Sequence, residues 1–88
     1  MRRVIVYKSV KVADMYLFVD QHENLERVPP SLLARFGRPV EAMRFELTAE
    51  RRLARTEAPT VLEAISARGF YLQLPPVIDP AGSGQERE

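Results

Sequence analysis

The chain has no cysteine, no tryptophan, one histidine and four glycines among its 88 residues. The absence of cysteine excludes disulfide scaffolds, zinc sites built from four cysteines, and thiol catalysis. A single histidine means that any Ser-His-acid triad would depend on that one side chain as its base. Glycine is too sparse for a phosphate-binding loop. The sequence therefore offers few of the residue types on which common catalytic sites are built.

Excess charge and long apolar runs are also missing. The net charge at pH 7 is 13 − 12 = +1, which permits nucleic-acid binding without indicating it. No stretch approaches the roughly 20 apolar residues of a membrane span. The apolar run at residues 4–7 is too short for the hydrophobic region of a secretion signal. We expect a soluble, cytoplasmic protein without membrane attachment.

The first part of the chain predicts a β-hairpin. Residues 3–8 are apolar on both faces, which is typical of a central strand covered on both sides or facing a partner. Residues 15–20 predict a second strand, in which Tyr16 and Phe18 face away from the other apolar side chains. The connection at residues 9–14 is too short for a parallel crossover, so the two strands should be antiparallel neighbours.

Two more strands are predicted in the second half of the chain. Residues 41–47 alternate between apolar and polar side chains, which indicates one solvated face and a position at or near a sheet edge. The side chains expected to point inward are Met43, Phe45 and Leu47. Gly69 ends a helical pattern, and residues 70–74 alternate before two prolines stop the strand.

Two helices complete the pattern. Residues 30–36 predict a short helix that Gly37 ends. Residues 57–68 carry apolar side chains at helical spacing, with Thr56 as the expected N-cap. The order strand, strand, helix, strand, helix, strand predicts an α+β fold. We expect a two-layer sandwich, in which a four-stranded, mostly antiparallel sheet receives both helices on one face.

A single domain is predicted over residues 1–76. Residues 77–88 are rich in proline, glycine and serine with alternating charge, which predicts a disordered C-terminal tail.

Several short motifs follow one another along the domain. They are Tyr7-Lys8-Ser9, Tyr16-Leu17-Phe18-Val19, Arg27-Val28-Pro29, Phe36-Gly37 with Pro39, Ala42-Met43, Arg51-Arg52-Leu53 and Gly69-Phe70-Tyr71-Leu72-Gln73-Leu74-Pro75-Pro76. Together they resemble the YcgL family of small proteobacterial proteins over about residues 3–76. Two departures affect local geometry: Thr48-Ala49-Glu50 replaces an Asp-Gly type turn, and Pro59 lies in the first turn of the second helix.

The resemblance implies a compact α/β sandwich with no agreed enzymatic activity. Genes of the family often lie beside that of ribonuclease D, which implies a role in RNA processing. The resemblance thus predicts a non-enzymatic accessory or adaptor protein, whose partner is ribonuclease D or another RNA-processing protein. We expect no cofactor, and a monomer or a weak homodimer.

Basic and aromatic residues are the candidates for binding. The basic candidates are Arg44, Arg51, Arg52 and Arg55, and the aromatic candidates are Tyr7, Tyr16, Phe18 and Tyr71. An aromatic sheet face beside arginines can stack and neutralise single-stranded RNA, so a direct RNA-binding module is an alternative function. The competing interpretation places Tyr16 and Phe18 in the core and pairs Arg51 and Arg52 with nearby glutamates. An exposed apolar face would instead favour a protein partner or self-association.

An acidic loop carries the second alternative function. Asp20, Glu23 and Glu26 surround the single histidine, His22, and paired carboxylates could serve a small hydrolase. However, ligands so close together on one loop lack the convergent geometry of a metal or acid–base site. We therefore expect no catalytic residue and no metal site, with the hydrolase as the weakest alternative.

Overall fold

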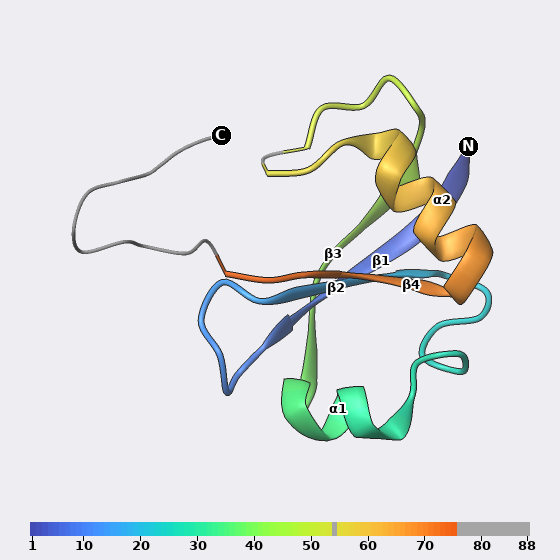
Figure 1. Ribbon diagram of the computed structural model, residues 1–88. Helices are drawn as coiled ribbons and strands as arrows, with labels where there is room; N and C mark the ends of the chain where they lie inside the picture. Colours follow the sequence, from blue (N-terminus) through green and yellow to red (C-terminus); the bar gives the residue numbers. More distant parts are fainter. Residues whose placement is uncertain (54, 76–88) are drawn as a thin grey trace, which may run out of the picture.

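The computed structural model describes residues 1–53 and 55–75. Within them the chain forms four strands and two helices in the predicted order (Figure 1). These are β1 (Arg2–Ser9), β2 (Tyr16–Asp20), α1 (Pro30–Phe36), β3 (Pro39–Leu47), α2 (Ala58–Arg68) and β4 (Phe70–Gln73). The predicted α+β class and element order are confirmed, while the predicted tail at residues 77–88 lies outside the described residues. No helix in this part of the chain is long and apolar enough to cross a membrane.

The four strands form one antiparallel sheet in the order β3-β1-β2-β4. The predicted hairpin is present, with Val4 opposite Asp20 and Lys8 opposite Tyr16. β1 is a central strand, as its apolar residues on both faces predicted. β3 lies at an edge, also as predicted, because its charged face needs contact with water.

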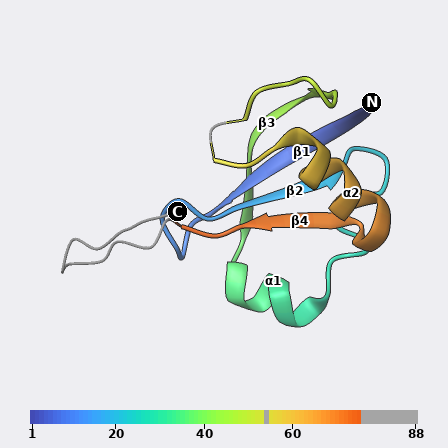
Figure 2. The same cartoon turned by 45° about the horizontal axis from the view of Figure 1, so that its top comes forward.

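The two helices lie on opposite faces of the sheet, α2 above it and α1 below it in Figure 1, and the turned view in Figure 2 keeps them apart. The core on the α2 face consists of Val4, Val6, Phe18, Leu47, Ala58, Val61 and Ile65. The core on the α1 face consists of Ile5, Leu17, Val19, Val28 and Phe36. This arrangement corrects the expectation that one face receives both helices. Since β1 and β2 carry large apolar side chains on both faces, each face needs its own cover.

The inward-pointing side chains of β3 and β4 also lie differently from the prediction. Phe45 packs on the α2 face, whereas Leu72 packs on the α1 face. Met43, predicted to be inward, is 52% exposed, and Leu74 is 60% exposed. Met43 loses its cover because α2 packs against β2 and β4 and leaves the middle of β3 open. A bulge at Ala42, between the pairs that β3 makes with β1, marks the same part of the strand.

Both helices end at a glycine, as predicted. Gly37 and Gly69 have backbone φ angles of 83° and 91°, which residues with a Cβ rarely adopt. The N–H of Gly69 donates to the carbonyl of Ile65 at 2.8 Å and closes the last turn of α2. The predicted N-cap of this helix is wrong. Glu57 takes that position instead of Thr56, and no side-chain hydrogen bond caps the helix.

Candidate functional site

Three of the four candidate aromatic rings lie on the α2 face of the sheet. Tyr16, Phe18 and Tyr71 all contact the core beneath α2. Phe18 is only 6% exposed, and its ring meets that of Tyr71 edge-on, with centroids 5.9 Å apart and planes at 75°. The hydroxyl of Thr56 donates to the hydroxyl of Tyr71 at 3.0 Å. Phe18 is therefore buried, whereas Tyr16 and Tyr71 are half-buried at the edge of this core.

Tyr7 lies apart from the other three rings. It packs on the α1 face, and its hydroxyl donates to Asn24 Oδ1 at 2.7 Å. This bond joins β1 to the loop that follows β2. The aromatic candidates therefore do not form the single exposed surface that a stacking platform for single-stranded RNA requires.

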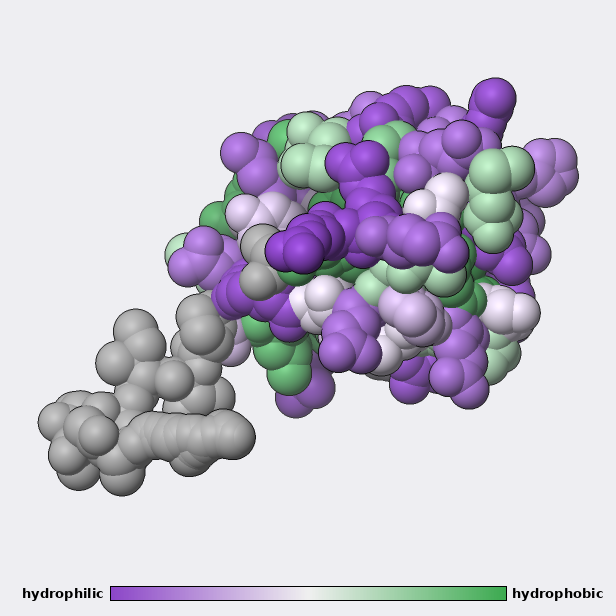
Figure 3. Space-filling model, turned by 90° about the horizontal axis from the view of Figure 1, so that it is seen from above, coloured by the Kyte–Doolittle hydropathy of each residue, from purple (hydrophilic) through white to green (hydrophobic). Residues whose placement is uncertain are grey.

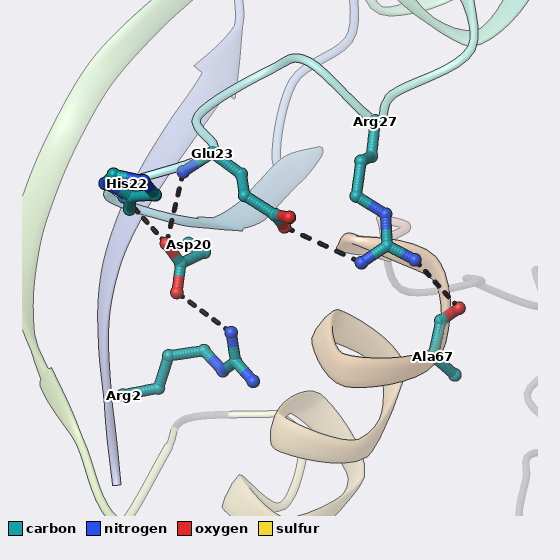
Figure 4. Close-up of polar contacts among 6 residues, drawn as sticks. All are labelled: Arg2, Asp20, His22, Glu23, Arg27 and Ala67. Atoms are coloured by element: carbon teal, nitrogen blue, oxygen red, sulfur yellow. Dashed lines mark hydrogen bonds and ion pairs between the residues drawn. The ribbon is translucent and has the colours of Figure 1, made fainter.

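Asp20 and Glu23 of the acidic loop bind residues of the protein itself (Figure 4). Arg2 donates to Asp20 Oδ2 at 2.9 Å, and the N–H groups of His22 and Glu23 donate to Asp20 Oδ1 at 2.7 and 3.2 Å. Burial alone would raise the pKa of Asp20, but these donors bring it below its usual value of 3.8. Glu23 pairs with Arg27 at 3.6 Å. In the part of the chain that the structure describes, no three His, Cys, Asp or Glu residues gather to hold a metal ion.

Three of the four candidate arginines, Arg51, Arg52 and Arg55, lie in the connection from β3 to α2, residues 48–57, which we call the arginine segment. Arg44 lies within β3, opposite Ile5 of β1. The guanidinium of Arg51 lies over the ring of Phe45, 4.1 Å from its centroid, in a cation–π contact. Arg52 is exposed, and its backbone forms an isolated antiparallel bridge with Glu57. The bridge ties Arg52 to the residue that precedes α2, which leaves the exposed side chain of Arg52 at the surface.

The other two candidate arginines have different partners. Arg55 donates to the backbone carbonyl of Asp14 at 3.1 Å. Arg44 binds both carboxylate oxygens of Glu41, at 2.8 and 2.9 Å, which lowers the pKa of Glu41. Among the described residues, no carboxylate forms an ion pair with an arginine of the arginine segment. The competing interpretation, in which Arg51 and Arg52 pair with nearby glutamates, is therefore not observed among these residues. Their positive charges remain available to a partner.

A hollow of about 160 Å³ lies beside the arginine segment on the α2 face. Its lining includes Val6, Tyr16, Phe18, Met43, Phe45 and Leu53. A more polar hollow of about 430 Å³ lies between the segment and the start of α2. Figure 3 shows the molecule from above, with hydrophilic side chains (purple) over most of the surface and hydrophobic areas (green) between them. Available cations and a small apolar hollow therefore adjoin one another on this face.

A larger groove, of about 720 Å³, lies on the other side of the sheet and was not predicted. Its apolar side chains come from three separate segments, at residues 12–15, 29–36 and 72–74. We call it the α1 groove. The one feature of the sequence that could have indicated this groove is the pair Leu72 and Leu74, in and just after β4. The prediction assigned both leucines to the core.

A family model for the YcgL domain matches residues 4–76 of this chain. The chain belongs to the YcgL family. The resemblance that its motifs predicted is confirmed, and the arginine segment and both hollows lie inside the matched YcgL domain.

Curated relatives carry the same domain name. A YcgL domain-containing protein of Pseudomonas aeruginosa is 49% identical over 77 residues, which is 86% of this chain and 79% of the relative. One of Pseudomonas putida is 46% identical over 80 residues, or 90% of this chain and 82% of the relative. One of Cellvibrio japonicus is 46% identical over 71 residues, or 81% and 72%. These names state the domain and no activity.

Proposed function

We propose that this YcgL domain is a non-enzymatic adaptor of the cytoplasm that binds a protein of RNA processing. The observation that carries the proposal is the arginine segment, whose cations pair with no carboxylate among the described residues and adjoin an apolar hollow. Arginine and methionine are enriched in protein interfaces, and the guanidinium of arginine suits carboxylates in a planar, bidentate geometry. The half-exposed Met43 lines the same hollow as Leu53 of the arginine segment and supplies apolar contact.

The identity of the partner rests on the family resemblance. Because the resemblance implies that genes of the family often lie beside that of ribonuclease D, a ribonuclease D-type nuclease is the first partner to test. The partner should present a carboxylate-bearing surface with an apolar residue able to enter the hollow, since that surface complements both features of the arginine segment.

Direct binding of single-stranded RNA is a second candidate, favoured by the same available arginines. Phosphate contacts would supply its affinity, and that affinity would fall steeply with salt. The aromatic contribution is weaker here than the sequence suggested, because Phe18 and Tyr71 pack against each other and the core.

A binding titration separates these candidates. The purified chain is titrated with the ribonuclease D-type nuclease of the same organism, and in parallel with a labelled single-stranded RNA of about 20 nucleotides. The variant Arg52→Glu should weaken binding to the nuclease about tenfold, which corresponds to about 1.4 kcal/mol. Arg38→Glu is the matched control, because Arg38 is also exposed but precedes β3, at the opposite end of that strand.

Three outcomes decide between the candidates. Binding to the nuclease that Arg52→Glu weakens and Arg38→Glu preserves supports the adaptor. Binding to RNA alone, with the same dependence on Arg52, favours the second candidate. If the nuclease and a panel of other RNA-processing proteins all fail to bind at low salt, the adaptor proposal is wrong.

A further inference from the structure

The α1 groove lies on the opposite face from the arginine segment and has no part in the function proposed above. It is bounded by α1, by the turn between β1 and β2, and by the end of β4. The apolar side chains used here are Val12, Met15, Leu32, Leu72 and Leu74. Its volume of about 720 Å³ is within the range of known ligand pockets. An apolar concavity of this size at a surface is typical of a binding site.

Among the described residues, the charged groups at the α1 groove are basic. Arg35 lines it from the last turn of α1. Lys11 lies beside the end of the same helix, where its Nζ donates to the carbonyl of Ala34 at 3.3 Å. Neither Arg35 nor Lys11 forms an ion pair with a described residue. Asp14 is the acid nearest to Lys11 in the turn, but it does not line the groove.

We propose that the α1 groove binds an acidic, amphipathic segment of a partner protein. Apolar side chains of that segment would lie on the leucines of the groove, as amphipathic segments do in other hydrophobic grooves. Aspartates or glutamates beside them would pair with Arg35 and Lys11. A basic segment is disfavoured, because its charges would face these two cations without a carboxylate among the described residues of the lining.

Two pairs of variants test the groove within the full chain. Leu74→Asp places a charge on the apolar lining, and Leu74 is already 60% exposed, so the fold should tolerate the change. Val10→Asp is its control, because Val10 is 58% exposed in the neighbouring turn but does not line the groove. Arg35→Glu reverses the charge of the groove, and Arg52→Glu makes the same change in the arginine segment.

The probe is a displayed library of random peptides, selected against the full chain. The enriched peptides should carry net negative charge and at least two large apolar residues. The strongest of them, made synthetically and titrated by fluorescence anisotropy, should bind at least tenfold more weakly to Leu74→Asp and to Arg35→Glu. Its affinity should stay within twofold for Val10→Asp and Arg52→Glu. Circular dichroism checks that each variant is folded.

Several results would overturn the proposal. One is the absence of any enriched peptide, and another is enrichment of basic or uncharged sequences. A third is equal loss of affinity in a groove variant and its control. Dimerisation that Leu74→Asp abolishes would assign the groove to a second copy of the chain. Peptide binding only after Ile78→Asp would assign it to residues of the chain's own C-terminal segment.

Discussion

Gly69 joins α2 to β4, and replacing it with alanine should destabilise the fold in a calculable way. Its backbone has φ 91° and ψ −2°, the left-handed conformation. A Cβ built there would overlap Cβ of Arg27 and lie 2.8 Å from its Cδ. Arg27 cannot simply rotate away, because its Cβ is attached to the backbone of the loop before α1. Its side chain also donates to the carbonyl of Ala67 at 3.1 Å, at the end of α2 (Figure 4).

Two costs of Gly69→Ala add together. A residue with a Cβ in the left-handed conformation costs about 1–2 kcal/mol. Forcing a methyl group into a packed contact costs about 1–3 kcal/mol. The free energy of unfolding should therefore fall by about 2–5 kcal/mol, a large share of the 5–15 kcal/mol that is typical of a whole domain. At about 4–8 °C per kcal/mol for a chain of this size, even the low end lowers Tm by about 8 °C.

Urea unfolding followed by far-ultraviolet circular dichroism measures this loss, and a double-mutant cycle separates its parts. Arg27→Gly removes the opposing Cβ, so Gly69→Ala in that background should cost only the conformational part, about 1–2 kcal/mol. If Gly69→Ala changes the free energy of unfolding by less than about 0.5 kcal/mol in the wild-type background, the left-handed conformation and the contact are both wrong. An equal cost in both backgrounds would refute the contact with Arg27 alone.

Three shorter predictions concern stability. Asp20→Asn should destabilise the fold near pH 7. Because the pKa of Asp20 in the folded state lies below its usual 3.8, the difference in the free energy of unfolding between the two proteins should be fully present above pH 3.8 and should vanish as the pH falls through the folded-state pKa. Urea titrations of both proteins at several acid pH values measure this difference. Leu47→Ala should lower the free energy of unfolding by about 2–5 kcal/mol because Leu47 is fully buried, whereas Met43→Ala should lower it by less than about 1 kcal/mol. Similar losses for the two variants in urea unfolding would contradict the finding that Leu47 is buried and Met43 is exposed. Tyr71→Phe removes the hydrogen bond to Thr56 and should cost about 0.5–1.5 kcal/mol in thermal unfolding, and an unchanged Tm would mean that the bond contributes nothing.

The candidate site was only partly predictable from the sequence. The arginine segment was found because Arg51, Arg52 and Arg55 are neighbours in the chain, so local sequence reveals a local cluster of charge. The exposure of the aromatic residues stayed open in the sequence, because alternation tells which side chains share a face of a strand but not whether a helix covers that face. The α1 groove was missed because its lining comes from three distant segments, which meet only when α1 folds under the hairpin and β4.

Local patterns account for the elements of this YcgL domain. Alternation specifies the strands, apolar spacing specifies α2, and Gly37 and Gly69 end the helices because few other residues adopt positive φ angles. The side of the sheet on which each helix lies is not a local property. It follows from the antiparallel pairing that places β1 and β2 at the centre, where both of their apolar faces need cover. With one helix on each face, the middle of β3 and the end of β4 stay open, and both proposed binding surfaces arise there.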